Sequence, residues 1–159
     1  MRRLVGPGGA VVGIDTSSSM LDAARRRVRR AGWPDVVFVE ADATDVAGAL
    51  RTVGVDVGAV RAVVATFVLS LLPDDAPVWQ AVDALASRQP LCVAVADLGP
   101  PVDAPAPLRP LLRALTALGG GDPARRPWEQ LLARSADAAH EVCHGGHVHL
   151  AVGDMDHPG

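Results

Sequence analysis

The chain contains no lysine and no tyrosine, and it has few aromatic residues. Aromatic residues make up 3% of the sequence against 49% hydrophobic residues, so Val, Leu and Ala must fill the core. Such a core suits a sheet that is covered by helices on both faces. It disfavours a nucleic-acid-binding module that stacks bases on aromatic side chains.

Strong net charge, long apolar runs and closely spaced cysteines are also missing. The formal charge of -3 gives no general attraction to nucleic-acid phosphates or anionic lipids. No window reaches the roughly 18 apolar residues of a membrane span. Cys92 and Cys143 lie far apart, and no signal-peptide pattern precedes the fold. We therefore expect a soluble, reduced, cytoplasmic protein without nucleic-acid or membrane partners.

The stretch from Val11 to Leu21 organises the N-terminal part of the chain. Its apolar residues predict a buried strand that ends at Asp15, and Ser19, three residues before Asp22, indicates a helix start. In open parallel α/β sheets, ligands bind outside the carboxyl ends of the strands, and an acid there can accept hydrogen bonds from both ribose hydroxyls. We expect Asp15 to bind a nucleoside-containing ligand.

Strands and helices are predicted to alternate along the rest of the chain. Predicted strands cover residues 36–40, 61–67, 91–96 and 147–152. Predicted helices cover residues 18–31, 46–53, 76–87, 111–118 and 127–142. The alternation favours a doubly wound, Rossmann-like α/β sheet that is mostly parallel, with the last strand antiparallel, in one domain over residues 1–159.

A second acid, Asp42, follows the predicted strand 36–40. This spacing places Asp15 and Asp42 on neighbouring strands at one edge of a crevice, where one could hold a ribose and the other an adenine edge. The alternative is that both aspartates only cap helices and turns.

The sequence also contains residues for two other kinds of site. Zinc ligands could come from a C-terminal group of Cys143, His144, His147 and His149, with Asp154 and His157 nearby. The spacing favours incidental surface histidines and no metal. Ser70, Asp97 and a histidine could form a hydrolase triad, but the chain has no Gly-x-Ser-x-Gly elbow.

Four segments resemble, in order, the class I S-adenosylmethionine-dependent methyltransferases. They are VVGIDTSSSMLDAA (11–24), VVFVEADA (36–43), FVLSLLPD (67–74) and GGHVHLAVG (145–153). The resemblance implies S-adenosylmethionine as cofactor and transfer of its methyl group to a small-molecule acceptor.

The resemblance also implies roles for residues of the first two segments. Asp15 would bind the ribose hydroxyls, with Thr16 and Met20 beside the adenosine. Asp42 would accept a hydrogen bond from the adenine amino group, and Ala43 would offer its backbone amide to the ring.

Further roles are implied beyond residue 60. Thr66 and Phe67 would line the sulfonium end of the cofactor, and Ser70 takes a position often held by His in related sequences. Residues 99–135 match the variable segment that shapes the acceptor pocket. No catalytic base is assigned.

The sequence departs from the family pattern in two places. The family begins with a strand and a glycine-rich loop about 20 residues before the ribose acid, whereas fourteen residues precede Asp15. Arg61 stands where members commonly carry an acid. We therefore expect an N-terminally truncated, incomplete domain that lacks the central first strand. Its strands at Val11 and Arg61 would have unpaired edges open to self-association or to a partner.

Three functions stay open at this point. The first is methyl transfer, and the second is a non-catalytic remnant or a partner-completed Rossmann-like binding module. The third is a fragment of a nicotinamide-dependent oxidoreductase. The chain has no tyrosine to serve such an oxidoreductase, and Asp42 fits a methyltransferase better.

Overall fold

The computed structural model describes residues 5–6, 8–99, 125–143 and 146–155. The chain divides into two compact units, residues 1–59 and 60–159. We describe each unit by itself, and the expectation of one incomplete domain stays a prediction. The predicted helix 111–118 and residues 100–124 of the predicted acceptor segment 99–135 lie outside the described residues.

The first unit is built around two parallel strands. Its elements are β1 (Val11–Asp15), α1 (Ser18–Ala31), β2 (Val36–Glu40), a short 3-10 helix (Ala43–Asp45), α2 (Val46–Thr52) and a second 3-10 helix (Val57–Ala59). Val11 pairs with Val36 and Asp15 with Glu40, so both strands end at the same level. The sequence predicted β1, α1, β2 and α2 to within a residue, but it did not predict the two 3-10 helices.

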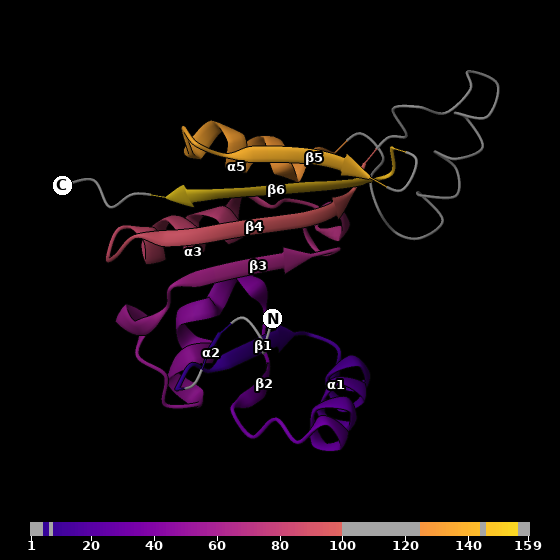
Figure 1. Cartoon of the computed structure of the whole chain (residues 1–159), viewed down its shortest axis with the longest axis vertical. Coiled ribbons are helices and arrows are strands. Elements are labelled where there is room, and N and C mark those ends of the chain that lie inside the picture. Colours follow the sequence, from indigo (N-terminus) through magenta and orange to yellow (C-terminus); the bar gives the residue numbers. More distant parts are fainter. Residues whose placement is uncertain (1–4, 7, 100–124, 144–145, 156–159) are drawn as a thin grey trace. The chain divides into compact units, whose positions relative to one another are not determined.

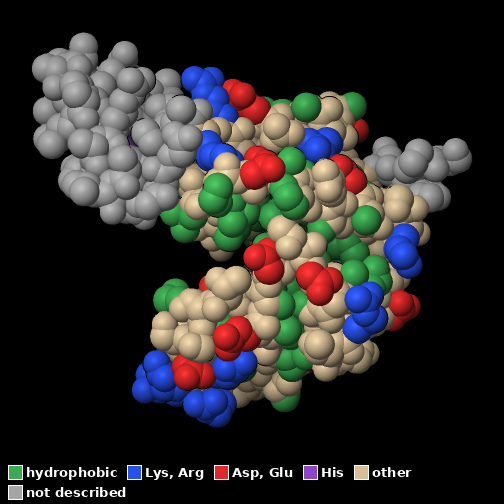
Figure 2. All heavy atoms as spheres, turned by 180° about the vertical axis from the view of Figure 1, so that it is seen from behind, with side chains coloured by type: hydrophobic (Ala, Val, Ile, Leu, Met, Phe, Trp, Pro, Cys, Tyr) green, Lys and Arg blue, Asp and Glu red, His purple; other side chains and the backbone are tan. Residues whose placement is uncertain are grey.

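Local signals set the ends of α1. The Ser17 side chain accepts a hydrogen bond from the Met20 amide at 3.4 Å and caps the first turn. Gly32 ends the helix with φ +65°, a left-handed conformation that glycine adopts without strain. Leu21 is the buried residue of α1, while arginine side chains gather on its outer surface (Figure 2). The arginine-rich face of α1 is therefore turned to solvent.

The second unit is a mixed four-stranded sheet with the order β3-β4-β6-β5 (Figure 1). Its elements are β3 (Ala62–Thr66), α3 (Ala76–Ala86), β4 (Leu91–Leu98), α5 (Pro127–Arg134), β5 (Ala139–Cys143) and β6 (Val148–Met155). β3 and β4 are parallel, and β6 runs antiparallel to β4 and β5. The predicted antiparallel last strand is confirmed.

The predicted helix 127–142 is wrong in its second half. The helix ends at Arg134, and Ala139–Cys143 forms β5 along β6. Ser135 already has extended dihedral angles of φ -127° and ψ 121°. Hydrogen bonding to β6 provides a stronger constraint than the modest helix preference of this alanine-containing stretch.

The core of the second unit lies on one face of the sheet. Leu91, Val93 and Val95 of β4 are buried together with Trp79 of α3 and Leu131 of α5. On the opposite face, Val64, Leu150 and Val152 are exposed. The chain is thus an α/β fold with a mixed sheet, and the finer doubly wound arrangement stays a prediction.

β1 and β3 are both edge strands. Among the described residues, β1 pairs with β2 alone and β3 with β4 alone. Each strand therefore presents one edge of backbone donors and acceptors without a strand partner in that part of the chain. None of the described helices combines the length and the hydropathy needed to cross a membrane.

Candidate functional site

The first unit brings Asp15 and Asp42 to adjacent strand ends. The Ala41 amide donates to the Asp15 carbonyl at 3.1 Å, which extends the pairing of β1 with β2 beyond Glu40. Asp42 is the next residue, and both carboxylates are exposed. Two carboxyl side chains therefore follow the carboxyl ends of two adjacent parallel strands.

One oxygen of Asp15 is used by the turn that leads into α1. The Ser17 amide donates to Asp15 Oδ1 at 2.8 Å. Among the described residues, Oδ2 has no hydrogen bond or ion pair. Thr16, which lies between Asp15 and Ser17, is exposed. Met20, in the first turn of α1, is 61% exposed. Oδ1 therefore stabilises the turn, as the capping alternative predicted. Oδ2 can accept hydrogen bonds from a ligand.

Asp42 has the same local arrangement. Its Oδ1 accepts a hydrogen bond from the Thr44 amide at 2.8 Å and starts the 3-10 helix, whose first residue is Ala43. This backbone hydrogen bond, assisted by the Thr44 side chain, lowers the pKa of Asp42 below its ordinary value of 3.8. Asp42 is therefore an anionic acceptor at neutral pH.

An open hollow of about 450 Å³ lies beside β2 and α2 in the first unit. Its lining residues are Val39, Glu40, Ala41, Asp45, Gly48, Ala49, Arg51 and Thr52. It adjoins Asp42 in the sequence but includes none of the predicted cofactor residues.

The second unit places Thr66 and Phe67 at the carboxyl end of β3. The Phe67 amide donates to the Ala96 carbonyl at 2.7 Å, and Phe67 has φ +52°. Phe67 as a whole is 48% exposed. An aromatic residue in a left-handed conformation, half in solvent, is unusual at the end of a strand.

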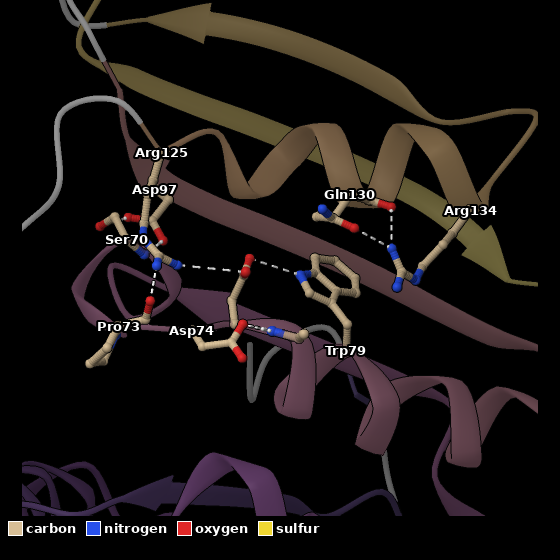
Figure 3. Close-up of polar contacts among 10 residues, drawn as sticks. Ser70, Pro73, Asp74, Trp79, Asp97, Arg125, Gln130 and Arg134 are labelled. Atoms are coloured by element: carbon tan, nitrogen blue, oxygen red, sulfur yellow. Dashed lines mark hydrogen bonds and ion pairs between the residues drawn. The ribbon is translucent and has the colours of Figure 1, made fainter.

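Ser70 and Asp97 form a buried pair directly beyond this corner (Figure 3). The Ser70 amide donates to Asp97 Oδ2 at 3.0 Å, and the Ser70 hydroxyl donates to Oδ1 at 2.5 Å. The sequence places Ser70 and Asp97 together only in the hydrolase alternative, and it does not predict this hydrogen-bonded pair. The available signal was an acid directly after the apolar predicted strand 91–96.

The C-terminal histidines differ from the expectation of incidental surface residues. His149 is buried, because β6 turns its side chain toward α5, where it stacks on Trp128. His140 Nε2 lies 3.0 Å from His149 Nδ1. His147 precedes β6 in a turn. Among the described residues, which leave out His144, no group of three or more potential metal ligands is found.

A family model described as "Methyltransferase domain" matches residues 1–87, more than half of the chain. No curated protein sequence matches. A crystal structure of an S-adenosylmethionine-dependent methyltransferase from Aquifex aeolicus is similar, with 16% identity and a TM-score of 0.64, over 97% of this chain and 73% of that one. A possible exported protein from Bordetella parapertussis has 16% identity and a TM-score of 0.61, over 94% of this chain and 54% of that one. At these identities the structures show the fold.

Proposed function

Because the chain belongs to the methyltransferase-domain family, we propose that it binds S-adenosylmethionine and takes part in methyl transfer to a small-molecule acceptor. One observation carries this proposal beyond the family. Asp15 and Asp42 lie at the carboxyl ends of two adjacent parallel strands. In each residue, one carboxylate oxygen accepts a hydrogen bond from a backbone amide. Such held carboxylates are preorganised acceptors for the hydroxyl and amino groups of a nucleoside.

The residues of the first unit suit the adenosine part of this cofactor. Asp15 Oδ2 would accept from the ribose hydroxyls, while the Ser17 amide keeps the carboxylate from rotating. Asp42, ionised at neutral pH, would accept from the adenine amino group. Thr16, Met20 and Ala43 would border the adenosine, and the exposed Met20 side chain offers a flexible apolar contact.

The role of Thr66 and Phe67 at the sulfonium end of the cofactor stays an expectation from the resemblance. When bound, the cofactor supplies a methyl group on a positively charged sulfur, which is already a good leaving group. The protein therefore contributes mainly by orienting the cofactor and the acceptor and by excluding water. No base of this chain is assigned to the reaction.

A second candidate function is a binding module that needs a partner strand. It is favoured by the edges of β1 and β3, for which the described residues provide one strand partner each. This candidate predicts weak cofactor binding by the chain alone and tighter binding when a partner is added.

Isothermal titration of the 159-residue chain with S-adenosylmethionine and with S-adenosylhomocysteine separates these candidates. We expect one-to-one binding with a dissociation constant on the order of micromolar, about -8 kcal/mol of binding free energy. NAD serves as the control ligand, since a nicotinamide-dependent fragment would prefer it. A folded chain that binds none of the three would contradict the methyltransferase proposal and favour the partner-dependent module.

A further inference from the structure

The sheet of the second unit has one face without helices in the described part of the chain, which we call the open face. Both α-helices described in this unit, α3 and α5, pack on the opposite face, where Trp79 and Leu131 are buried against β4 (Figure 1). Parallel strands such as β3 and β4 are usually covered by helices on both faces. The strand register assigns these alternate residues to the open face: Ala62, Val64 and Thr66 of β3, Cys92, Ala94, Ala96 and Leu98 of β4, Val148, Leu150, Val152 and Asp154 of β6, and Ala139, Glu141 and Cys143 of β5.

The open face is hollowed along β4. The hollow has a volume of about 550 Å³, and its lining includes Ala94 and Ala96, which are half-buried. Val64 on β3 flanks these alanines on one side, and Leu150 and Val152 on β6 flank them on the other. The three larger side chains are between 38% and 45% exposed. Apolar side chains on both sides of a lower floor make a groove, which suits the rounded apolar side of a helix better than the flat face of another sheet.

The charged residues of the open face are all acidic. Glu141 and Asp154 are both exposed, and the open face of the described strands carries neither Lys nor Arg. Glu141 also lines the groove. If the open faces of two copies met, the interface would gain two more acids and no base, which opposes that dimer. Basic residues on a different partner would complement the two carboxylates.

We propose that the open face binds an amphipathic helix of another protein, whose apolar residues enter the groove and whose flanking residues are lysine or arginine. Such helices bind hydrophobic grooves through apolar residues at positions i, i+3, i+4 and i+7. The flanking cations pair with Glu141 and Asp154, and exposed ion pairs of this kind add selectivity more than affinity. The surface belongs to the second unit alone, so its occupation requires neither the cofactor nor residues of the first unit.

Two synthetic helical peptides provide the test with the full chain. One has leucines at positions i, i+3, i+4 and i+7 and lysines elsewhere, and its twin has glutamates in place of the lysines. We expect the lysine peptide to bind with a dissociation constant on the order of 10–100 μM and the glutamate peptide to bind about fivefold more weakly. Backbone amide NMR shifts should change around Val64, Ala94 and Val152. Shift changes confined to α3 and α5, or equal binding of the two peptides, would overturn the proposal.

Leu150→Gln tests the apolar part of the groove. Because Leu150 is already 38% exposed, the fold should be retained, and we expect the lysine peptide to bind about tenfold more weakly. Val142→Gln is the matched control. Val142 is 39% exposed on β5, but it lies opposite His149, on the sheet face that α5 covers. The control should keep the affinity of the unmodified chain, and equal losses in the two variants would place the peptide outside the groove.

Glu141→Gln tests the charge of the open face. It should lower the preference for the lysine peptide over the glutamate peptide about twofold, because one exposed ion pair is lost. Glu129→Gln is the matched control, since Glu129 is an exposed acid on α5 that pairs with Arg126 at 3.1 Å. The control should keep the full preference. Equal effects of the two variants would mean that the peptide responds to the net charge of the chain, and the proposal would be wrong.

Sedimentation velocity of the same Leu150 variant tests a second copy of the chain as the occupant. We expect Leu150→Gln and the unmodified chain to have the same association state, because the open face binds a different partner. If the unmodified chain were a dimer and Leu150→Gln made it a monomer, the open face would pair with itself. A helix of another protein would then not be its occupant.

Discussion

The indole of Trp128 stacks on the imidazole of His149, with 3.7 Å between the ring centroids and 7° between the ring planes. Trp128 belongs to α5 and His149 to β6, so the stack joins the helix to the sheet. Gly99 lies against both rings. A Cβ atom there would come within 2.4 Å of Trp128 Cη2 and 2.5 Å of His149 Cδ2. Close packing against these rings therefore requires glycine at this position.

Gly99→Ala should lower the free energy of unfolding by about 1–3 kcal/mol, because the added methyl overpacks a buried contact between two rings. Urea unfolding followed by tryptophan fluorescence measures the change. Gly58→Ala is the control, since a Cβ there would meet only the Asp56 carboxylate, at 3.3 Å and on a movable side chain. Equal free energies of unfolding in both variants would mean that the rings of Trp128 and His149 can move apart to accommodate the methyl group without loss of stability.

Asp15→Asn should weaken S-adenosylmethionine binding by about tenfold or more, because the ribose hydroxyls lose a charged acceptor. The variant keeps an oxygen for the Ser17 amide, so the thermal midpoint should stay close to that of the unmodified chain. Asp22→Asn makes the same chemical change on the same unit at an exposed ion pair with Arg25, 3.1 Å long. That control should leave affinity unaltered. Equal affinities in the two variants would remove Asp15 from the site.

Asp42 should titrate below its ordinary pKa of 3.8, because the Thr44 amide hydrogen bond favours the ionised carboxylate. A lowered pKa stabilises the folded state fully above about pH 4, and this contribution is lost as the pH falls through the lowered pKa. Carboxyl carbon shifts measured by NMR give the midpoint, and the Thr44 amide shift should follow the same curve. Asp42→Asn should abolish that response at Thr44. A midpoint at or above 3.8 would contradict the hydrogen bond.

The sequence predicted best what local residues determine. Val11 to Asp15 is a valine-rich run closed by an acid, and Ser17 and Gly32 cap the following helix, so each signal lies within a few residues of its effect. The adjacency of Asp15 and Asp42 followed from the carboxyl ends of parallel strands meeting at one edge. These features needed no knowledge of distant contacts.

What escaped prediction depends on contacts across the sequence. Ala139–Cys143 becomes a strand only because β6 pairs with it. Asp97 and Ser70 are 27 residues apart, and only the parallel pairing of β3 with β4 brings them together. The spacing of the C-terminal histidines predicted a surface position for His149, yet alternation along β6 turns its side chain toward Trp128 of α5. The sequence shows such residues but not their partners.

Self-association through the β3 edge leads to a final prediction. β3 is an edge strand, and Val64 on it is 38% exposed on the sheet face opposite the core. An exposed apolar edge strand can pair with the same strand of another molecule. Val64→Lys should therefore reduce association, since a lysine on an edge strand opposes pairing by charge repulsion.

Sedimentation velocity over a range of protein concentrations measures this effect. Val142→Lys is the matched control, because Val142 is similarly exposed at 39% and lies on β5, the opposite edge of the same sheet. We expect the Val64 variant to sediment as a smaller species at concentrations where the unmodified chain and the Val142 variant associate. If the Val142 variant alone dissociates, the β5 edge is the contact. If neither variant differs from the unmodified chain, strand edges of this sheet do not drive association.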